Sequence, residues 1–372
     1  MKNRIRIAYI TKNLRINGIS AVLMNYSKEL DKKKYEVTIF SGLPISEVHK
    51  KACNDYGIKL IETPQKKNFI KYYLFLFKNI SKKKYDIVHF HCNSASITPE
   101  LLIVALKGIK IRIAHSHNTT CDHRFAHFLM KPIMNRMLTY RFACGKEAGK
   151  WLYGKQKKFD VINNGFDTEK YRFNSKSRQE TRKKLGYKDE IVIGHVGRFN
   201  ELKNHDFLLD VFEQLIKKDD RYRLLLIGNG PNYEHIKERI NKEDCTDKII
   251  MYGETNNVKE LYDAMDLFVL PSKHEGLVVV LLEAQINGLN CLVSDSVSNE
   301  GFINDTSVRT LSLAEPIEKW VNEIRNTKYH TETQRGSFIE NNTTNVNRYE
   351  IKNNVSSLEN KYNELYSNYI EK

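Results

Sequence analysis

The sequence predicts an α/β protein with two domains, each built on a parallel sheet. Short apolar runs typical of buried strands alternate with helical patterns, and the alternation restarts after residue 190. Such alternation indicates parallel strands with helices on both faces of the sheet. A length of 372 residues is long for one domain and suits two. We therefore expect two Rossmann-like domains facing across a cleft, with ligands beyond the carboxyl ends of the strands.

The expected elements follow in order along the chain. In the first half we expect a helix at about residues 20–30, and strands at 5–10, 35–40, 58–61, 86–91 and 111–116. In the second half we expect strands at 191–196, 223–227, 249–252, 267–270 and 290–293. The polar stretch 168–189 is expected to be the linker. A last helix is indicated by apolar residues spaced three and four apart, at 351, 355, 358, 362, 365 and 369.

The composition is that of a soluble globular protein, with 41% hydrophobic and 28% charged residues. No run of eighteen apolar residues occurs, so no transmembrane helix is expected. The first residues lack the apolar core and cleavage site of a signal peptide. Six cysteines without a Cys-x-x-Cys pair favour free thiols in a reducing cytosol over disulfides or a zinc site. We therefore expect a cytoplasmic protein.

The segment from Glu275 to Glu283 carries the most informative pattern. An apolar run, 267–270, and a turn come before it and predict a buried strand. The segment itself predicts a short loop with an acid and a glycine, followed by a helix with a second acid. The amides of Gly276, Leu277 and Val278 would open the helix and point at a diphosphate. Glu283 could accept hydrogen bonds from two ribose hydroxyls, because an ionised carboxylate has acceptors only.

The two acids and their spacing resemble the acid-x7-acid signature of the retaining GT-B glycosyltransferases of family 4. The resemblance implies transfer of a sugar from a nucleotide donor with its anomeric configuration retained. It places Glu275 at the transferred sugar, where positive charge develops. Leu277, Val278 and Val279 depart from the usual aromatic, glycine and proline, and are similar to the variant in capsule and exopolysaccharide enzymes. The resemblance also implies that the last helix packs back on the first domain. The expected domains are 1–167, 168–345 and this helix, 346–372.

Other segments of the second half carry the same resemblance. Arg198 and Lys203 match the family's Gly-Arg-x4-Lys element and would flank the diphosphate, so no metal and no cofactor is implied. The glycine turn at 228–230 is interpreted as structural or as a ligand contact. The loop before Val258 is expected to border the nucleobase through Asn257 and Val258. Uridine diphosphate is the commoner donor among similar enzymes.

The first half is expected to supply the acceptor side. Gly18, in the segment Asn17-Gly18-Ile19, would bring the first helix close to the donor phosphates. His117 matches the family's strand-end histidine, which faces the transferred sugar and the acceptor. As a catalytic residue it could hydrogen-bond a sugar hydroxyl or assist the attacking hydroxyl. We expect His115 to point to the opposite side of its strand. His89 and His91 have the spacing of zinc ligands but no further partner in the sequence, so they are interpreted as structural.

The net charge of +15 indicates an acidic partner, which could be nucleic acid, an anionic membrane or a phosphorylated ligand. Two basic and aromatic stretches, 66–78 and 124–131, are typical of helices on anionic membranes. They are equally typical of helices that pack on a sheet with their lysines in water. The membrane hypothesis places the first domain on the inner leaflet, with a polyprenyl-linked saccharide as acceptor.

Two other classes compete with the transferase. A GT-B nucleotide-sugar epimerase would use the same donor, and a phosphorylase would need a pyridoxal-bearing lysine that the sequence does not reveal. A basic nucleic-acid-binding protein fits the charge. However, the lysines are spread and no helix-turn-helix, zinc finger or aromatic RNA motif occurs, so no nucleic acid is expected as a partner.

Overall fold

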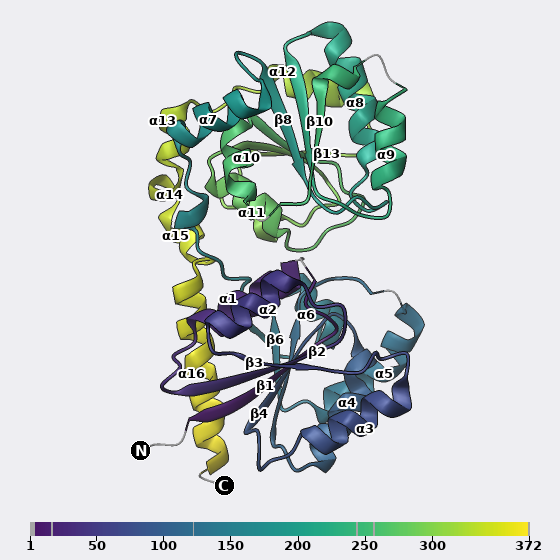
Figure 1. Ribbon diagram of the computed structural model, residues 1–372, viewed down its shortest axis with the longest axis vertical. Coiled ribbons are helices and arrows are strands. Elements are labelled where there is room, and N and C mark those ends of the chain that lie inside the picture. Colours follow the sequence, from purple (N-terminus) through teal and green to yellow (C-terminus); the bar gives the residue numbers. More distant parts are fainter. Residues whose placement is uncertain (1–3, 16–17, 122, 243–244, 256, 371–372) are drawn as a thin grey trace. The chain divides into compact units, whose positions relative to one another are not determined.

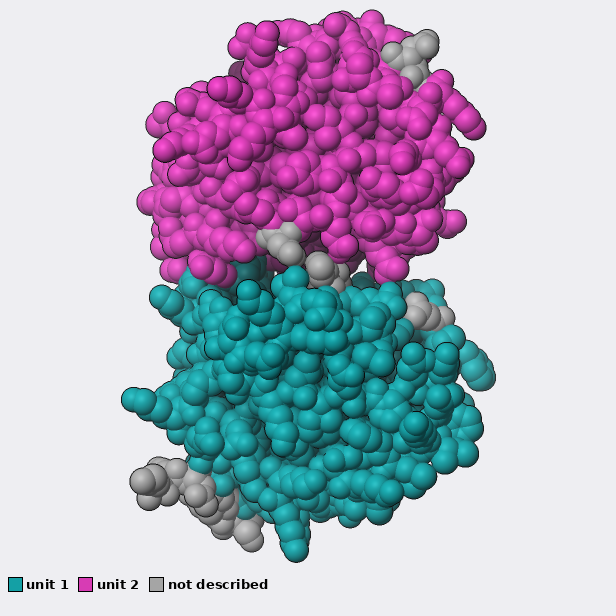
Figure 2. Space-filling model, in the orientation of Figure 1, with its two compact units in different colours: residues 1–166, 348–372 teal, residues 167–347 magenta. Residues whose placement is uncertain are grey.

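The computed structural model describes residues 4–15, 18–121, 123–242, 245–255 and 257–370. The chain forms two compact units, coloured separately in Figure 2. Unit 1 comprises residues 1–166 and 348–372, and unit 2 comprises residues 167–347. Each unit holds one parallel sheet with helices on both faces, so the predicted α/β class with two Rossmann-like domains is confirmed.

The sheet of unit 1 has the strand order β3-β2-β1-β4-β5-β6-β7, and every described pairing is parallel. Its strands are β1 (Ile5–Thr11), β2 (Tyr35–Ser41), β3 (Lys59–Glu62), β4 (Ile87–Cys92), β5 (Ile111–Ser116), β6 (Tyr140–Ala143) and β7 (Asp160–Val161). The sequence did not predict β6 and β7, because they are short, with four and two residues.

Two layers of helices cover the sheet of unit 1 (Figure 1). One apolar core holds side chains from α1 (Gly18–Glu29), α2 (Glu47–Asp55) and α16 (Ile351–Ile370). A second core, against the other face, holds side chains from α3 (Phe69–Asn79), α4 (Thr98–Leu106), α5 (Arg124–Met137) and α6 (Lys146–Tyr153).

The last helix, α16, is an integral part of unit 1. Its residues Val355, Leu358 and Tyr362 lie in the core with β1 and β2. The Tyr362 hydroxyl lies 3.1 Å from that of Tyr9, in the first strand. The two ends of the chain therefore share one core. The chain passes from unit 1 to unit 2 after residue 166 and returns to unit 1 after residue 347.

The sheet of unit 2 has the order β10-β9-β8-β11-β12-β13, again with every described pairing parallel. Its strands are β8 (Ile191–Val196), β9 (Tyr222–Ile227), β10 (Ile249–Gly253), β11 (Leu267–Leu270), β12 (Asn290–Ser294) and β13 (Val308–Leu311). The edge strand β13 was not predicted. Half of its four residues are exposed, so its apolar pattern is weak.

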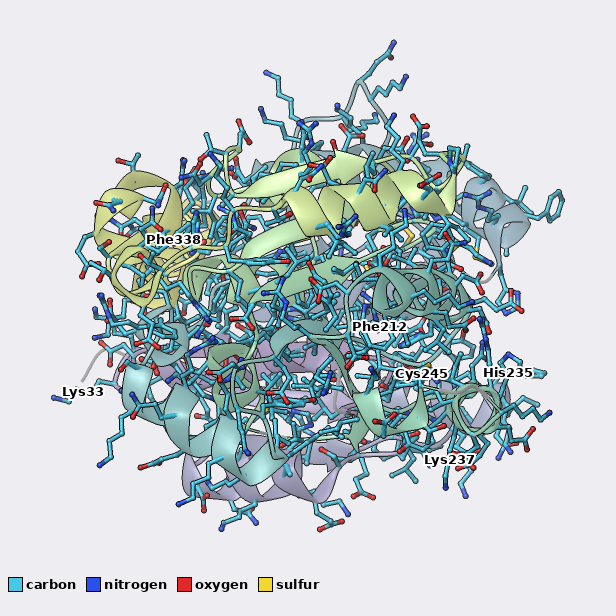
Figure 3. All side chains as sticks on the ribbon, turned by 90° about the horizontal axis from the view of Figure 1, so that it is seen from above. Lys33, Phe212, His235, Lys237, Cys245 and Phe338 are labelled. Carbon is cyan, nitrogen blue, oxygen red and sulfur yellow. The ribbon has the colours of Figure 1, made fainter. Side chains whose placement is uncertain are left out.

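Helices also cover both faces of this second sheet. One core contains α8 (His205–Lys218), α9 (Tyr233–Ile240) and α12 (Ile317–Asn326), and the other contains α10 (Val258–Ala264) and α11 (Val279–Ile286). Figure 3 shows Phe212 of α8 in the interior of unit 2, whereas His235 and Lys237 of α9 extend from its surface. The remaining helices are the short α13 (Glu332–Gly336), α14 (Phe338–Asn341) and α15 (Thr343–Asn347).

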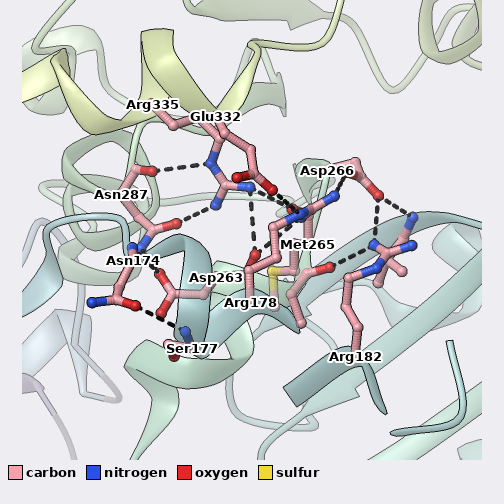
Figure 4. A network of polar contacts seen from close by, with 12 residues as sticks. Asn174, Ser177, Arg178, Arg182, Asp263, Met265, Asp266, Asn287, Glu332 and Arg335 are labelled. Atoms are coloured by element: carbon pink, nitrogen blue, oxygen red, sulfur yellow. Dashed lines mark hydrogen bonds and ion pairs between the residues drawn. The ribbon is translucent and has the colours of Figure 1, made fainter. Parts of the chain in front are cut away.

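The stretch expected to be a linker is instead folded. It contains α7 (Ser175–Leu185), which packs on α10 inside unit 2. Arg178 and Arg182 of α7 both reach Asp266, at 2.6 and 3.2 Å (Figure 4). From α13, the buried Arg335 donates to the carbonyl of Met265 at 2.8 Å. The linker prediction was wrong because polar side chains here bind other polar groups rather than water.

None of the helices in the described part of the chain is both long enough and apolar enough to cross a bilayer.

Candidate active site

The strand order of unit 2 locates a candidate ligand site. The chain runs outward from β8 through β9 to β10, and then returns to place β11 on the other side of β8. Because all pairings are parallel, the carboxyl ends of these strands share one edge. Ligands in open α/β sheets bind at the point where the strand order reverses. In unit 2 this point lies between the loops that follow β8 and β11.

The carboxyl ends of β8, β9 and β10 are tied together by backbone hydrogen bonds. The Gly197 amide donates to the Ile227 carbonyl at 3.0 Å, and the Gly228 amide donates to the Gly253 carbonyl at 2.9 Å. Gly228 has φ +136°, and a Cβ on it would lie 2.0 Å from the Gly197 carbonyl oxygen. No side chain fits there. The glycine turn after β9 is therefore required for packing at this edge.

Lys203 and Glu275 meet at the switch point. The Lys203 ammonium lies 2.7 Å from the Glu275 carboxylate, and their side chains are 13% and 22% exposed. The loops that carry them are also joined, because the Lys273 amide donates to the Leu202 carbonyl at 2.8 Å. A second bond, from the Glu275 amide to the Ser296 carbonyl, anchors the acid. The pair is thus held in place and still reachable from solvent.

Arg198 differs from Lys203 in its surroundings. Its side chain is exposed, and within the described residues it makes no ion pair. Phe199, the next residue, is fully buried, and its amide donates to the Asn229 carbonyl at 3.0 Å. The loop is therefore fixed while the guanidinium remains available to an anion.

The helix after Glu275 begins later than expected. α11 starts at Val279, and Val278 is its N-cap. Gly276, Leu277 and Val278 consequently lie before the helix rather than in its first turn, because the β-branched Val278 keeps extended backbone angles, with φ −96° and ψ 108°. In the described part of the chain their amides make no backbone hydrogen bond. They remain potential donors to an anion in front of the helix.

Glu283 lies in the second turn of α11 and is 8% exposed. Burial raises its pKa to about 7, and hydrogen bonds from the hydroxyls of Tyr171 and Tyr262 oppose that rise. The Tyr262 hydroxyl donates to the carboxylate at 3.0 Å. The sequence did not predict these two tyrosines, because they lie far from Glu283 along the chain.

Three further predicted residues stand at the starts of helices. Asn257 is exposed and precedes α10, and its amide donates to the Thr255 hydroxyl at 3.1 Å. Val258 is half-buried and is the first residue of α10. In unit 1, Gly18 is the first residue of α1, which follows β1. Asn17 lies outside the described residues.

Unit 1 gathers four histidines at two neighbouring strands, with His89 and His91 in β4, His115 in β5, and His117 directly after β5. His91 and His115 are direct partners in the parallel ladder, and their rings lie 5.6 Å apart. The rings of His115 and His117 lie 4.2 Å apart. The expectation that His115 points to the opposite side was wrong, because residues two apart in a strand share a face. His89 and His91 also gain the partner that the sequence did not reveal, because a neighbouring strand supplies it.

Hydrogen bonds run in a short chain through His117. Its Nδ1 lies 3.3 Å from Asn164 Oδ1, and its Nε2 lies 2.9 Å from His91 Nδ1. An amide oxygen only accepts, so His117 carries its proton on Nδ1 and accepts from His91 at Nε2. Burial lowers the pKa of His117 to about 4 and that of His91 well below its usual value. The pair is neutral and has a defined tautomer.

Ring nitrogens of His89, His91 and His115 lie within 4.8 Å of one another. Zinc–nitrogen distances of about 2.0–2.1 Å place tetrahedral ligands roughly 3.4 Å apart. The 4.8 Å limit on the nitrogen separations is wider than this spacing, so it does not by itself define a zinc geometry. His115 is bonded through Nε2 to the carbonyl of Ile162 at 3.2 Å, and its Nδ1 has no partner among the described residues. We interpret the cluster as a neutral imidazole layer that supports His117.

Comparison with known proteins identifies the class. Residues 16–170 match the family model described as Glycosyltransferase Family 4, and residues 177–345 match the model described as Glycosyl transferases group 1. Together these matches cover most of both units, and each unit has the fold that the resemblance implied. The chain therefore belongs to the group 1 glycosyltransferases and has the GT-B fold, as predicted.

Named relatives agree with this assignment. The chain is 29% identical over 372 residues to EpsF of Bacillus subtilis, a protein named as a glycosyltransferase, with 96% of each chain covered. It is 28% identical over 300 residues to the capsular polysaccharide biosynthesis glycosyltransferase CapH of Staphylococcus aureus, with 75% and 79% covered. The crystal structure of Anabaena Alr3699/HepE in complex with UDP superimposes with a TM-score of 0.78 at 16% identity, covering 97% and 100%. This chain is a glycosyltransferase of polysaccharide or glycolipid biosynthesis.

Proposed function

We propose that the protein transfers a sugar from a UDP-sugar to a saccharide or lipid-linked saccharide acceptor, with retention of the anomeric configuration, during cell-surface polysaccharide biosynthesis. The observation that carries this proposal is the Lys203–Glu275 pair at the switch point of unit 2. The structural relative HepE was crystallised with UDP and with UDP-glucose. An Escherichia coli relative, 22% identical over 345 residues, is named as a galactosyltransferase that uses UDP-Gal and a diphosphoundecaprenol-linked acceptor.

The donor half of the reaction needs a stabilised leaving group. When the glycosidic bond breaks, negative charge develops on the diphosphate, and preorganised donors aimed at that charge lower the barrier. Unit 2 offers the exposed Arg198 guanidinium and the Lys203 ammonium. The amides of Gly276 to Val278 add uncharged donors on the adjoining loop. This set would let the enzyme work without a metal ion or cofactor.

Glu275 has two roles in this proposal. Its contact with Lys203 holds the ammonium in position. Its carboxylate would also bind hydroxyls of the transferred sugar and stabilise positive charge at the anomeric carbon. Glu283 would accept hydrogen bonds from the ribose hydroxyls, and Asn257 and Val258 would border the base.

The acceptor half is assigned to unit 1. His117 is 7% exposed and has both ring nitrogens engaged, with Asn164 and His91. With a pKa of about 4 it is neutral at physiological pH. We therefore assign it a hydrogen-bonding role toward a sugar hydroxyl, which would take the place of Asn164 or His91 at one ring nitrogen, rather than storage of a proton. In a retaining transfer, the donor phosphate itself would accept the proton of the attacking hydroxyl.

A two-part experiment tests the proposal. First, UDP-, GDP- and ADP-sugars are compared by thermal shift, because a ligand that binds only the native state raises the melting temperature. UDP-sugars should give the largest shift. Second, the anomeric proton of the product is followed by NMR with a saccharide acceptor. Inversion would refute the retaining mechanism, and a new nucleotide sugar formed from donor alone would identify an epimerase.

A further inference from the structure

Three neighbouring helices of unit 1 carry large apolar side chains that point into solvent. The helices are α3, α4 and α5. The exposed side chains are Phe69, Ile70, Leu74, Phe77, Leu102, Leu106, Phe125, Phe128, Leu129 and Ile133. We call this set the outer apolar face. Phe125 is 84% exposed and Leu106 is 69% exposed. Most of the large apolar side chains that the described residues expose belong to this face.

The pattern arises because each helix is apolar on two sides. In α3, Tyr72 and Leu76 are buried in the core of unit 1. On the same helix, Ile70, Leu74 and Phe77 recur at spacings of four and three and form a second, exposed stripe. A surface helix normally needs only one apolar stripe, toward its core. The outer stripe therefore has no role in the packing of unit 1.

The stripes of the three helices adjoin one another. α4 packs against both α3 and α5, and all three cover the same side of the sheet (Figure 1). In the sequence, α3 and α5 belong to separate basic stretches, and Leu102 and Leu106 of α4 lie in neither. Only the folded structure brings these three segments together. Contiguous exposed apolar surface of this extent marks an interaction site.

The exposed charge on these three helices has a single sign. α3 and α5 contain no acidic residue, and the only acid of α4, Glu100, is 2% exposed and paired with Lys66 at 2.5 Å. Exposed cations lie on these helices or next to them in the sequence, at Lys67, Lys71, Lys78, Lys82, Lys83, Lys84, Arg124 and Arg136. Lys107 lies with its ammonium 3.4 Å from the centre of the Phe77 ring. Apolar stems and charged ends are thus interleaved, as at a membrane interface.

We propose that the outer apolar face docks unit 1 on an anionic lipid bilayer. The lysines and arginines would bind the headgroups, and the phenylalanine, leucine and isoleucine side chains would enter the boundary between headgroups and acyl chains. No helix has to span the bilayer. If the proposed function holds, this docking would bring the enzyme to a lipid-linked acceptor, but the docking itself requires neither donor nor acceptor.

The charge and composition of the outer apolar face argue against two other partners, a second copy of the chain and single-stranded nucleic acid. In a two-fold dimer the same patch would face itself, so the cations of both copies would repel each other. Homodimer cores are moreover poor in lysine. Single-stranded nucleic acid would need flat aromatic rings in a basic groove, whereas more than half of this face is Leu and Ile. An anionic bilayer offers headgroups to the cations and acyl chains to the aliphatic side chains.

The test is vesicle co-sedimentation of the full chain, with phosphatidylcholine alone and with phosphatidylglycerol added. The protein should bind the anionic vesicles at least tenfold more tightly. Phe125→Ser with Leu129→Ser should weaken that binding at least tenfold, because both apolar anchors are lost. Lys67→Glu with Lys71→Glu should remove most of the preference for anionic lipid. Both pairs are exposed, so folding should be unaffected, which circular dichroism verifies.

Matched controls make the result specific. Val48→Ser changes an exposed apolar residue on α2, in the layer on the other face of the same sheet. Lys183→Glu with Lys184→Glu changes two exposed cations of unit 2. Both controls should bind like the wild type. The proposal fails if the wild type ignores anionic vesicles, if the controls lose as much binding as the test variants, or if Phe125→Ser with Leu129→Ser instead abolishes a dimer seen by analytical ultracentrifugation.

Trp151 offers a readout of insertion. It stacks on His127 of α5 at 4.7 Å and lies 5.9 Å from the Phe128 ring, next to the outer apolar face. The chain's other tryptophan, Trp320, is fully buried in unit 2. Lipids with brominated acyl chains should therefore quench Trp151 and leave Trp320 unchanged. The variant Trp151→Phe should lose the quenching, and quenching that persists would show that the contact lies elsewhere.

Discussion

Replacing Glu283 by glutamine probes the most unusual carboxylate of the candidate site. Burial raises the pKa of Glu283 from 4.5 to about 7, even though the hydroxyls of Tyr171 and Tyr262 favour its ionised form. Ionisation of this side chain therefore costs the folded protein more than it costs the unfolded chain. Glu283→Gln keeps the shape and removes the charge. The variant should be more stable than the wild type wherever Glu283 would be ionised.

The size and sign of the effect follow from linkage. A raised pKa in the folded state gives a stabilisation that is complete below pH 4.5, the unfolded value, and is lost as the pH rises through about 7. A difference of roughly 2.5 pKa units corresponds to about 3.5 kcal/mol, at about 1.4 kcal/mol per unit, and most of this change falls between pH 4.5 and pH 8. The free energy of unfolding of the wild type, relative to Glu283→Gln, should thus fall by about 3 kcal/mol between pH 4.5 and pH 8.

Urea unfolding of both proteins at several pH values measures this difference. Contributions of all other titrating groups cancel between the two proteins. Glu238→Gln, an exposed acid of α9, is the matched control and should show no pH-dependent difference. Parallel stability curves for wild type and Glu283→Gln would refute the reasoning. A second check is calorimetry of UDP binding in two buffers, because ribose hydroxyls that bind the ionised carboxylate would release a proton near pH 7.

Three more predictions follow from the site. Arg198→Ala should lower turnover about 100- to 1000-fold, as for loss of one donor to a developing charge. The melting temperature should not change, because the side chain is exposed. Equal losses of activity and melting temperature would show a structural role. Gly228→Ala should cost about 3 kcal/mol or more in urea unfolding, because it combines a positive φ with a clash. The control Gly186→Ala has φ +79° and open space, so it should cost only about 1–2 kcal/mol, and equal costs would exclude the clash. Asn164→Asp places a carboxylate beside His117 Nδ1 and should raise the pKa of His117. The acid limb of the pH–rate profile should therefore move to higher pH. An unchanged acid limb would contradict the hydrogen-bonding role.

The segments of the candidate site in unit 2 could be recognised in the sequence because the residues of each segment are close together along the chain. Glu275 and Glu283 lie on one strand–loop–helix segment, and the local order of apolar run, acid, glycine and helix indicates a phosphate site without any tertiary contact. Arg198 and Lys203 form a second local segment after another strand. That the two segments meet, with Lys203 against Glu275, follows from the strand order.

The buried surroundings of these residues could not be predicted. Tyr262 reaches Glu283 from 21 positions earlier in the chain, and no local pattern links them. The four histidines are two pairs at separate strands, and parallel pairing of β4 with β5 brings them together. The polar helix α7 was mistaken for a linker because its arginines find partners on a distant turn.

The sequence by itself determined the alternation of strands and helices, the two-domain organisation and the local segments that carry the candidate site residues, because these depend on periodicity and on residues near one another along the chain. Only the tertiary structure decided which side chains lose water. It placed Glu283 between two tyrosines, enclosed His117 among neutral imidazoles, and left the outer sides of α3, α4 and α5 uncovered. Burial depends on contacts between distant segments, and burial sets both the pKa values of the site and the apolar surface available to a partner.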